Sequence, residues 1–375
     1  MVVPFLPLFL LQIGVHQHVA TWSGLLYSAS FFAGAISSPF WGAVADRYGR
    51  KPMIIRAGLV LFFVYFMTAF VTNPYELLFL RIIQGLLSGY IPGAIALVAT
   101  NTPEDHIGYA LSMISAASSS GTIVGPLLGG ILAHLFSNRI AFASAGILVL
   151  ISTVLVIFWV KEDKFVPAKT RSSMLKTFRD AAANRPLMAA LLLNMFTALS
   201  IMTVEPVITL YITQLIHSVN NASLIAGLVF SLSGIASALF APLWGRLADQ
   251  LGFTKVLLIG LAGGSIWTFM QLPLENIWWF ASVRFIYGVF FSAVFPAING
   301  LVVTSTTPSF RGRAFGLNQT ANQLGSMLGP IIGGLVVDVT SIHGLFWVTG
   351  AFLTVITTIS SFFVLHPRNT AHGES

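Results

Sequence analysis

Long runs of apolar residues, separated by short polar breaks, occupy most of this 375-residue chain. A helix of about 20 apolar residues crosses the hydrocarbon core of a bilayer. The runs are continuously apolar, whereas the strands of a membrane β-barrel alternate apolar and polar residues. The pattern therefore predicts an all-α membrane protein with twelve transmembrane helices. Their approximate bounds are 1–13, 21–43, 52–71, 77–99, 108–135, 140–160, 187–215, 222–245, 255–272, 278–304, 314–337 and 344–365.

The first run, "MVVPFLPLFLLQI", is shorter than the others. As a helix it covers roughly 18–20 Å, against about 30 Å for the hydrocarbon core. We expect that helix 1 is truncated and that residues preceding it are missing from the sequence. The alternative is a half-helix.

Composition supports the membrane interpretation. Hydrophobic residues make up 56% of the chain, charged residues 8%, and the mean hydropathy is +0.85. A soluble chain is usually about 45–50% apolar and about 25% charged. The chain has no cysteine, which excludes disulfides and zinc–thiolate sites. None of its eight histidines forms a pair at metal-ligand spacing, so we assign no metal and expect no cofactor.

The distribution of the 19 lysines and arginines predicts the orientation. With a cytoplasmic N-terminus, 16 fall in inner segments and only Arg139 falls in an outer loop. Arg81 and Arg284 lie within spans. By the positive-inside rule, both termini are expected in the cytoplasm of a multi-pass cell-membrane protein. The same rule explains the net charge of +7 without nucleic acid as a partner.

The longest polar stretch divides the twelve runs into six and six. We predict an N-terminal six-helix bundle at 1–160, a cytoplasmic central loop at 161–186, a C-terminal six-helix bundle at 187–366 and a cytoplasmic tail at 367–375. Within the loop, Met174, Leu175, Phe178 and Ala182 have helical spacing. They predict a short helix on the membrane surface. A solvated linker is the alternative.

The two halves repeat one another. "SPFWGAVADRYG" (38–49) matches "APLWGRLADQLG" (241–252) at an offset of 203 residues, and Arg81 and Gly85 match Arg284 and Gly288 at the same offset. "GTIVGPLLGG" (121–130) matches "GSMLGPIIGG" (325–334) at an offset of 204. Parallel repeats of six helices predict two pseudo-symmetric bundles that flank a central site and rock about it.

These motifs resemble those of the major facilitator superfamily. Within it, the chain is similar to the twelve-helix drug:proton antiporters, especially bacterial multidrug efflux proteins of the MdtG and PmrA type. The inner-loop signature G-x-L-a-D-r-x-G-r-k corresponds to Gly42, Val44 in place of leucine, Asp46, Arg47, Gly49, Arg50 and Lys51. The helix-4 signature corresponds to Arg81, Gln84 and Gly85, and the helix-5 antiporter signature to Gly121, Gly125, Pro126, Gly129 and Gly130.

The resemblance implies that the segment after helix 2 is a gating loop. Asp46, an acid among apolar helix ends, is expected to pair with a nearby arginine or to cap the N-terminus of a neighbouring helix when the cytoplasmic mouth is closed. Its repeat counterpart is Asp249. Simple positive-inside charge suffices for Arg50 and Lys51 but does not explain either acid.

Two sites are candidates for proton coupling, and for the first of them, in helix 4, the resemblance implies this role. Arg81 and Gln84 share a helix face that we expect to point into the bundle, because an arginine facing lipid is costly. The alternative for Arg81 is snorkelling to the outer interface. Glu205 in "IMTVEPVITLY" is the one carboxylate well within a span, which makes it the leading proton carrier. A carboxyl group at the outer rim, reached by water, is its alternative.

Two further groups have both a packing and a functional interpretation. The helix-5 glycines permit close helix packing, and only the resemblance connects them with export. Candidate residues for a substrate cavity are polar residues of the C-terminal half, which alternatively bond neighbouring helices to each other. They are Asn194, Asn299, Asn318, Gln319 and Asn322.

The sequence thus predicts proton-driven efflux of hydrophobic or cationic drugs by a monomer in the lipid bilayer. We do not expect an enzyme, because the chain has no P-loop and no recognisable nucleophile–base pair. The alternatives are an exporter of a sugar or other small metabolite on the same scaffold and a non-transporting membrane sensor.

Overall fold

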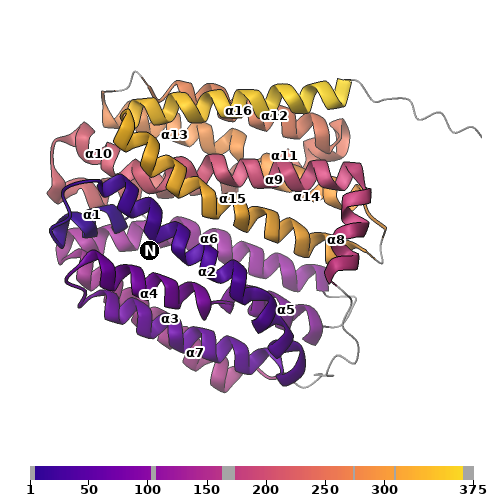
Figure 1. Ribbon diagram of the computed structural model, residues 1–375, viewed down its shortest axis with the longest axis horizontal. Helices are drawn as coiled ribbons and strands as arrows, with labels where there is room; N and C mark the ends of the chain where they lie inside the picture. The colour runs from indigo at the N-terminus through magenta and orange to yellow at the C-terminus, as the bar shows by residue number, and fades with distance from the viewer. Residues whose placement is uncertain (1–4, 103–106, 163–173, 273–274, 308–309, 366–375) are drawn as a thin grey trace, which may run out of the picture.

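A computed structural model describes residues 5–102, 107–162, 174–272, 275–307 and 310–365. These residues form sixteen α-helices and one short 3-10 helix. Most of the helices run side by side along the longest axis of the molecule (Figure 1). Over the described part of the chain the protein is all-α, as the sequence predicts.

Each apolar run of the sequence corresponds to a helix or a pair of helices. In the N-terminal half these are α1 (Leu6–Gln12), α2 (Val19–Tyr48), α3 (Arg50–Thr68), α4 (Pro74–Leu86), α5 (Tyr90–Asn101), α6 (Ile107–Leu135) and α7 (Asn138–Trp159). In the C-terminal half they are α9 (Arg185–Val204), η2 (Glu205–Val207), α10 (Ile208–Ile216), α11 (Val219–Leu251), α12 (Phe253–Phe269), α13 (Ile277–Phe291), α14 (Val294–Thr304), α15 (Arg311–Val339) and α16 (Ile342–Leu365).

Three of the twelve runs are interrupted, which the sequence pattern did not predict. The fourth divides into α4 and α5, the seventh into α9, η2 and α10, and the tenth into α13 and α14. Pro206 contributes to the second interruption, because proline has no N–H to continue the helical hydrogen bonds. By length and composition, seven segments of the described chain qualify as membrane spans, the longest being Arg185–Ile216 with 32 residues.

Each half has its own hydrophobic core. Leu26, Val64 and Phe142 pack together in the N-terminal half, and Leu257 and Val294 in the C-terminal half. Two pairs of helices make the main contacts between the halves, α2 with α15 and α6 with α11. The molecule therefore consists of two six-span bundles that meet along these two pairs.

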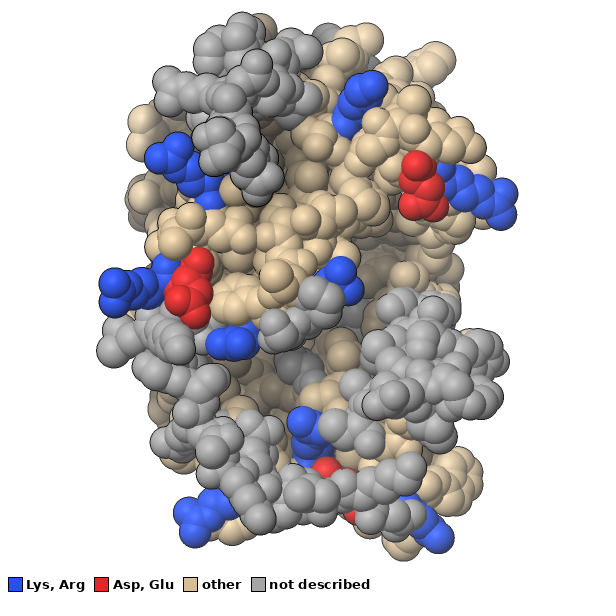
Figure 2. All heavy atoms as spheres, turned by 90° about the vertical axis from the view of Figure 1, so that its right-hand side faces the viewer, with Lys and Arg blue, Asp and Glu red and all other residues tan. Residues whose placement is uncertain are grey.

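At one end of the molecule, two pairs of helices are each connected by a single glycine. Gly49 joins α2 to α3 with φ +96°, and Gly252 joins α11 to α12 with φ +87°. Only glycine adopts such angles without steric cost. The predicted gating loop is thus mostly helical, with Arg47 in α2 and Arg50 and Lys51 in α3. We call this end the basic end, because lysine and arginine side chains surround its surface (Figure 2).

The helix α8 (Met174–Ala183) crosses the basic end, at the right of Figure 1. It falls within the predicted central loop, and the amphipathic spacing correctly predicted a helix there. Phe178 is exposed on α8, whereas Ala181 is buried against the start of α9. The predicted bounds of the two bundles, the loop and the tail stay predictions.

Candidate functional site

The helix-5 signature forms a close crossing between the two bundles. A Cβ atom added to Gly227 on α11 would lie 2.5 Å from the carbonyl oxygen of Pro126, and one added to Gly130 would lie 2.7 Å from that of Ser223. The hydroxyl group of Ser231 donates a hydrogen bond of 2.5 Å to the carbonyl oxygen of Ile123. Here α6 and α11 are in main-chain contact, which only small residues permit.

The crossing of α2 and α15 repeats these contacts. Ser28 donates to the carbonyl oxygen of Met327 at 2.6 Å. A Cβ on Gly24 would meet the carbonyl group of Pro330, and one on Gly334 would lie 2.6 Å from the oxygen of Ala20. Each contact is the repeat counterpart of one between α6 and α11, at offsets of 203 and 204 residues. The internal repeat therefore extends to single hydrogen bonds.

Towards the basic end, the same four helices are not in contact at their glycines. Cβ atoms added to Gly42 on α2, Gly121 on α6, Gly245 on α11 and Gly316 on α15 would have no atom within 4 Å. Figure 2 shows the face of the basic end hollowed between the two halves. The structure is therefore open between the bundles at the basic end and closed at the opposite end.

An ion pair lies beside the interface between the bundles. Glu205 begins the 3-10 segment η2, which packs against α1 and α2 of the other bundle. Its carboxylate lies 3.9 Å from a terminal nitrogen of Arg284 on α13. The side chain of Arg284 is 6% exposed and that of Glu205 is 25% exposed. The sequence places Glu205 and Arg284 correctly inside spans, but it did not predict that they pair with each other.

The other buried arginine has neutral partners. Arg81 donates to the side-chain oxygen of Gln84 at 2.7 Å, and Gln84 donates to the hydroxyl group of Tyr65 at 3.2 Å. Arg81 is 7% exposed and therefore does not snorkel to the interface. Both coupling candidates, Arg81 and Glu205, thus have their printed side-chain partners within their own bundles, Gln84 and Arg284.

The interruption of the fourth span has two side-chain donors. The indole N–H of Trp41 donates to the carbonyl oxygen of Leu86 at 2.7 Å. Arg56 donates to the next two carbonyl oxygens, of Leu87 at 3.2 Å and Ser88 at 2.9 Å, and its guanidinium group lies 3.4 Å from the centroid of the Trp41 ring. These donors satisfy carbonyl groups that the end of α4 leaves without helical partners.

The gating segment is bound by an acid that follows α7. The carboxylate of Glu162 accepts hydrogen bonds from the backbone N–H groups of Arg50 at 2.7 Å and Lys51 at 2.9 Å, and so caps α3. Capping of this kind was one role expected of Asp46, whose side chain lies outside the described residues. Asp249 is exposed and has no ion pair within the described chain. Sequence reasoning missed Glu162, whose only signal is its position just after a span.

The candidate cavity residues mostly join helices. Asn194 donates to the side-chain oxygen of Asn318 at 2.8 Å, Asn318 to Asn299 at 3.0 Å, and Asn322 to Asn194 at 3.4 Å. Asn194 and Asn318 are buried, whereas Gln319 is exposed. These four asparagines thus form hydrogen bonds between α9, α14 and α15, and their role in a substrate cavity stays a prediction.

The chain matches the family model described as the Major Facilitator Superfamily over residues 1–219 and 190–375. Among similar proteins is "Multidrug resistance protein MdtG" of Proteus mirabilis, 34% identical over 358 residues, with 94% of this chain and 88% of the relative covered. The protein of the same name from Salmonella paratyphi B is 34% identical over 378 residues, covering 99% of this chain and 92% of the relative.

Solved structures share the fold. The nucleoside transporter NupG has a TM-score of 0.78 and 15% identity, covering 97% of this chain and 94% of that one. A bacterial homologue of the human lysosomal transporter Spinster, in an inward-facing and unoccupied conformation, has a TM-score of 0.76 and 14% identity, covering 98% and 92%. With its two repeated bundles and these matches over nearly the whole length, the chain belongs to the major facilitator superfamily of membrane transporters.

Proposed function

We propose that the protein is a secondary active efflux transporter that exports hydrophobic or cationic drugs in exchange for protons. It alternates between a state open at the basic end and one open at the opposite end. The observation that carries the proposal is the pair of Glu205 and Arg284, which lies inside a span and beside the bundle interface. The drug class follows the name of the MdtG relatives.

The pair gives proton binding a mechanical consequence. A proton on Glu205 removes the negative charge that faces Arg284, so the guanidinium group becomes an unpaired cation in a buried place. An unpaired buried charge is costly. Because η2 packs against α1 and α2, the bundle can relieve this cost by moving relative to its partner. Proton binding thereby biases which end is open.

The orientation and the gate belong to the same proposal. The positive-inside rule makes the basic end cytoplasmic, so the state described here faces inward. The segment around Gly49 is then at the open cytoplasmic mouth. Asp46 and Asp249 are expected to find their partners in the other bundle only after this mouth has closed. Asp46→Asn should therefore lower the transport rate, and full activity in this variant would exclude the gate.

Dye efflux tests the function. Cells that express the protein and are loaded with ethidium should lose the dye faster than cells with empty vector, and a protonophore should abolish the difference. Glu205→Gln should remove proton-driven efflux. The control Glu275→Gln changes an exposed acid just before α13 and should keep it. Efflux that ignores the protonophore, or a fully coupled Glu205→Gln variant, contradicts the proposal.

A further inference from the structure

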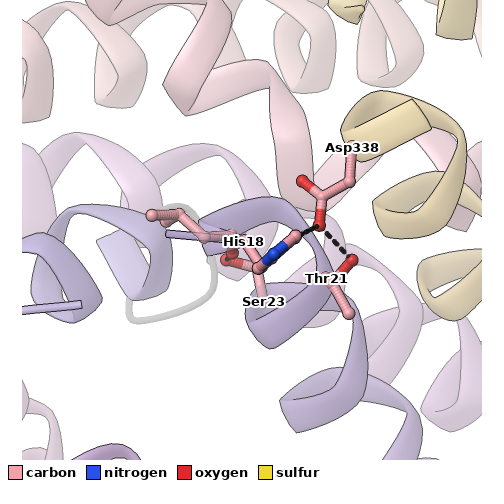
Figure 3. A network of polar contacts seen from close by, with 5 residues as sticks. His18, Thr21, Ser23 and Asp338 are labelled. Atoms are coloured by element: carbon pink, nitrogen blue, oxygen red, sulfur yellow. Dashed lines mark hydrogen bonds and ion pairs between the residues drawn. The ribbon is translucent and has the colours of Figure 1, made fainter. Parts of the chain in front are cut away.

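A polar contact ties the two bundles together at the closed end. His18 Nδ1 lies 2.9 Å from Asp338 Oδ2, and the hydroxyl group of Thr21 donates to the same oxygen at 2.5 Å. Figure 3 shows His18 and Thr21, from the start of α2, both pointing to Asp338 at the end of α15. Within the described residues, this is the contact between a histidine and an acid that joins the two bundles.

The capping of the two helices does not account for this contact. His18 is the N-cap residue of α2, but its side chain makes no capping hydrogen bond there. Asp338 lies in the last turn of α15, where the dipole disfavours an anion. His18 also has φ +52°, an uncommon angle for a residue other than glycine. Capping therefore does not explain these residues, whereas pairing across the interface does.

The repeat shows that the contact is an addition to the crossing. The counterparts of His18, Thr21 and Asp338 are Asn221, Leu224 and His134, so the crossing of α6 and α11 has no equivalent acid. The glycine and serine contacts, by contrast, occur in both crossings. Both crossings therefore share the glycine and serine contacts, whereas the contact between His18 and Asp338 occurs in only one of them.

The contact lies far from the point about which the bundles would rock. His18 is ten residues from Ser28, which corresponds to about 15 Å along α2. If α2 and α15 tilt apart to open the closed end, this contact separates more than the contacts of Gly24 and Ser28. It is consequently sensitive to the conformational state.

We propose that His18, Thr21 and Asp338 form a latch that holds the end opposite the basic end closed and that breaks whenever the protein opens there. The inference rests on the proposed alternating access. It adds that the balance between the two states is set partly outside the coupling site, by a contact present in only one of the two crossings.

Thiol labelling of the purified full-length protein tests the latch without any substrate. The chain has no cysteine, so Ser223→Cys introduces a single reporter. Ser223 is 5% exposed and lies in the α6–α11 crossing, away from the latch. In this background, Asp338→Asn should increase the rate of maleimide labelling about threefold to fivefold. His18→Lys, with a permanent cation, should decrease it.

Further variants separate a latch from a general loss of structure. Combining His18→Ala with Asp338→Asn should label no faster than Asp338→Asn alone, because both remove one contact. His16→Ala, which changes an exposed histidine of the same connection, should leave the rate unchanged. Additive effects of the two latch variants, or an unchanged rate in Asp338→Asn, overturn the latch. Labelling that follows the prediction in a protein without dye efflux would instead leave the latch standing and count against the transport function.

Discussion

The two bundles solve the same structural problem with different chemistry. Each has a buried arginine at the same place in the repeat, Arg81 on α4 and Arg284 on α13. Arg81 is held by a neutral amide, that of Gln84, whereas Arg284 faces the carboxylate of Glu205. The arginine therefore belongs to the common frame. Within the described residues, the C-terminal bundle alone combines this arginine with a carboxylate inside a span.

The largest effect should come from removing the two arginines in turn. Arg284→Gln leaves Glu205 without its partner and should lower the free energy of unfolding by about 2–3 kcal/mol, somewhat less than for a fully buried pair because Glu205 is partly exposed. Arg81→Gln removes only hydrogen bonds to neutral groups and should cost about 1–2 kcal/mol. Thermal unfolding in detergent measures both.

The double variant Glu205→Gln/Arg284→Gln is the control for this comparison. It removes both charges and should recover part of the stability that Arg284→Gln loses. Equal losses in Arg81→Gln and Arg284→Gln, without recovery in the double variant, would mean that the two bundles do not differ in the way we describe.

Alanine substitutions of glycine should destabilise the two crossings between the bundles by similar amounts. Gly227→Ala places a Cβ 2.5 Å from the carbonyl oxygen of Pro126 and should cost about 1–3 kcal/mol, and Gly24→Ala should cost a similar amount at the other crossing. Gly121→Ala is the matched control, since its Cβ would have no atom within 4 Å. It should be neutral or stabilising. Thermal unfolding in detergent measures these changes. A large loss of stability in the variant of only one crossing would contradict the equivalence of the two crossings.

Substitution of the two repeat-related tryptophans should lower the free energy of unfolding by slightly different amounts. Trp41 and Trp244 each donate to a carbonyl oxygen, of Leu86 and Val289, at 2.7 Å. Trp41→Phe also weakens the stacking of Arg56, so it should cost about 1–2 kcal/mol, against about 1 kcal/mol for Trp244→Phe. The difference should vanish in an Arg56→Gln background. Its persistence there would show that the guanidinium group has no part in it.

The smallest effect is expected at the cap of α3. Glu162→Gln keeps the shape of the side chain but removes the charge at the helix N-terminus, and should cost about 0.5–1 kcal/mol. Glu162→Asp shortens the side chain and should lose at least as much. If neither variant is less stable, water rather than Glu162 satisfies the backbone N–H groups at the start of α3.

The sequence was sufficient for the fold because its main signals are local or repeated. Apolar runs predict spans, and the matches at offsets of 203 and 204 residues predict two bundles. The burial of Arg81 also follows, because a charged head facing lipid is costly. The family resemblance then supplies the motifs that belong to the crossings and the basic end.

What the sequence did not predict depends on contacts between distant residues. Glu162 and Arg50 are 112 residues apart, and Asp338 and His18 are 320 apart, so no periodicity connects them. The asparagines had two interpretations because spacing shows which face they share but not which helix lies opposite. Pro206 indicates the interruption before α10, but it lies within a continuous apolar run, so the hydrophobic pattern alone predicted one unbroken helix.

The one-residue turns at Gly49 and Gly252 limit how the molecule can deform. A single residue keeps the ends of two helices together, so the basic-end tips of α2 and α3, and those of α11 and α12, cannot move apart. Because α2 also contacts α15, a displacement of α2 at the basic end carries the start of α3 with it. Adding two glycines after Gly49 would loosen this linkage while leaving the polar region around Glu205 untouched.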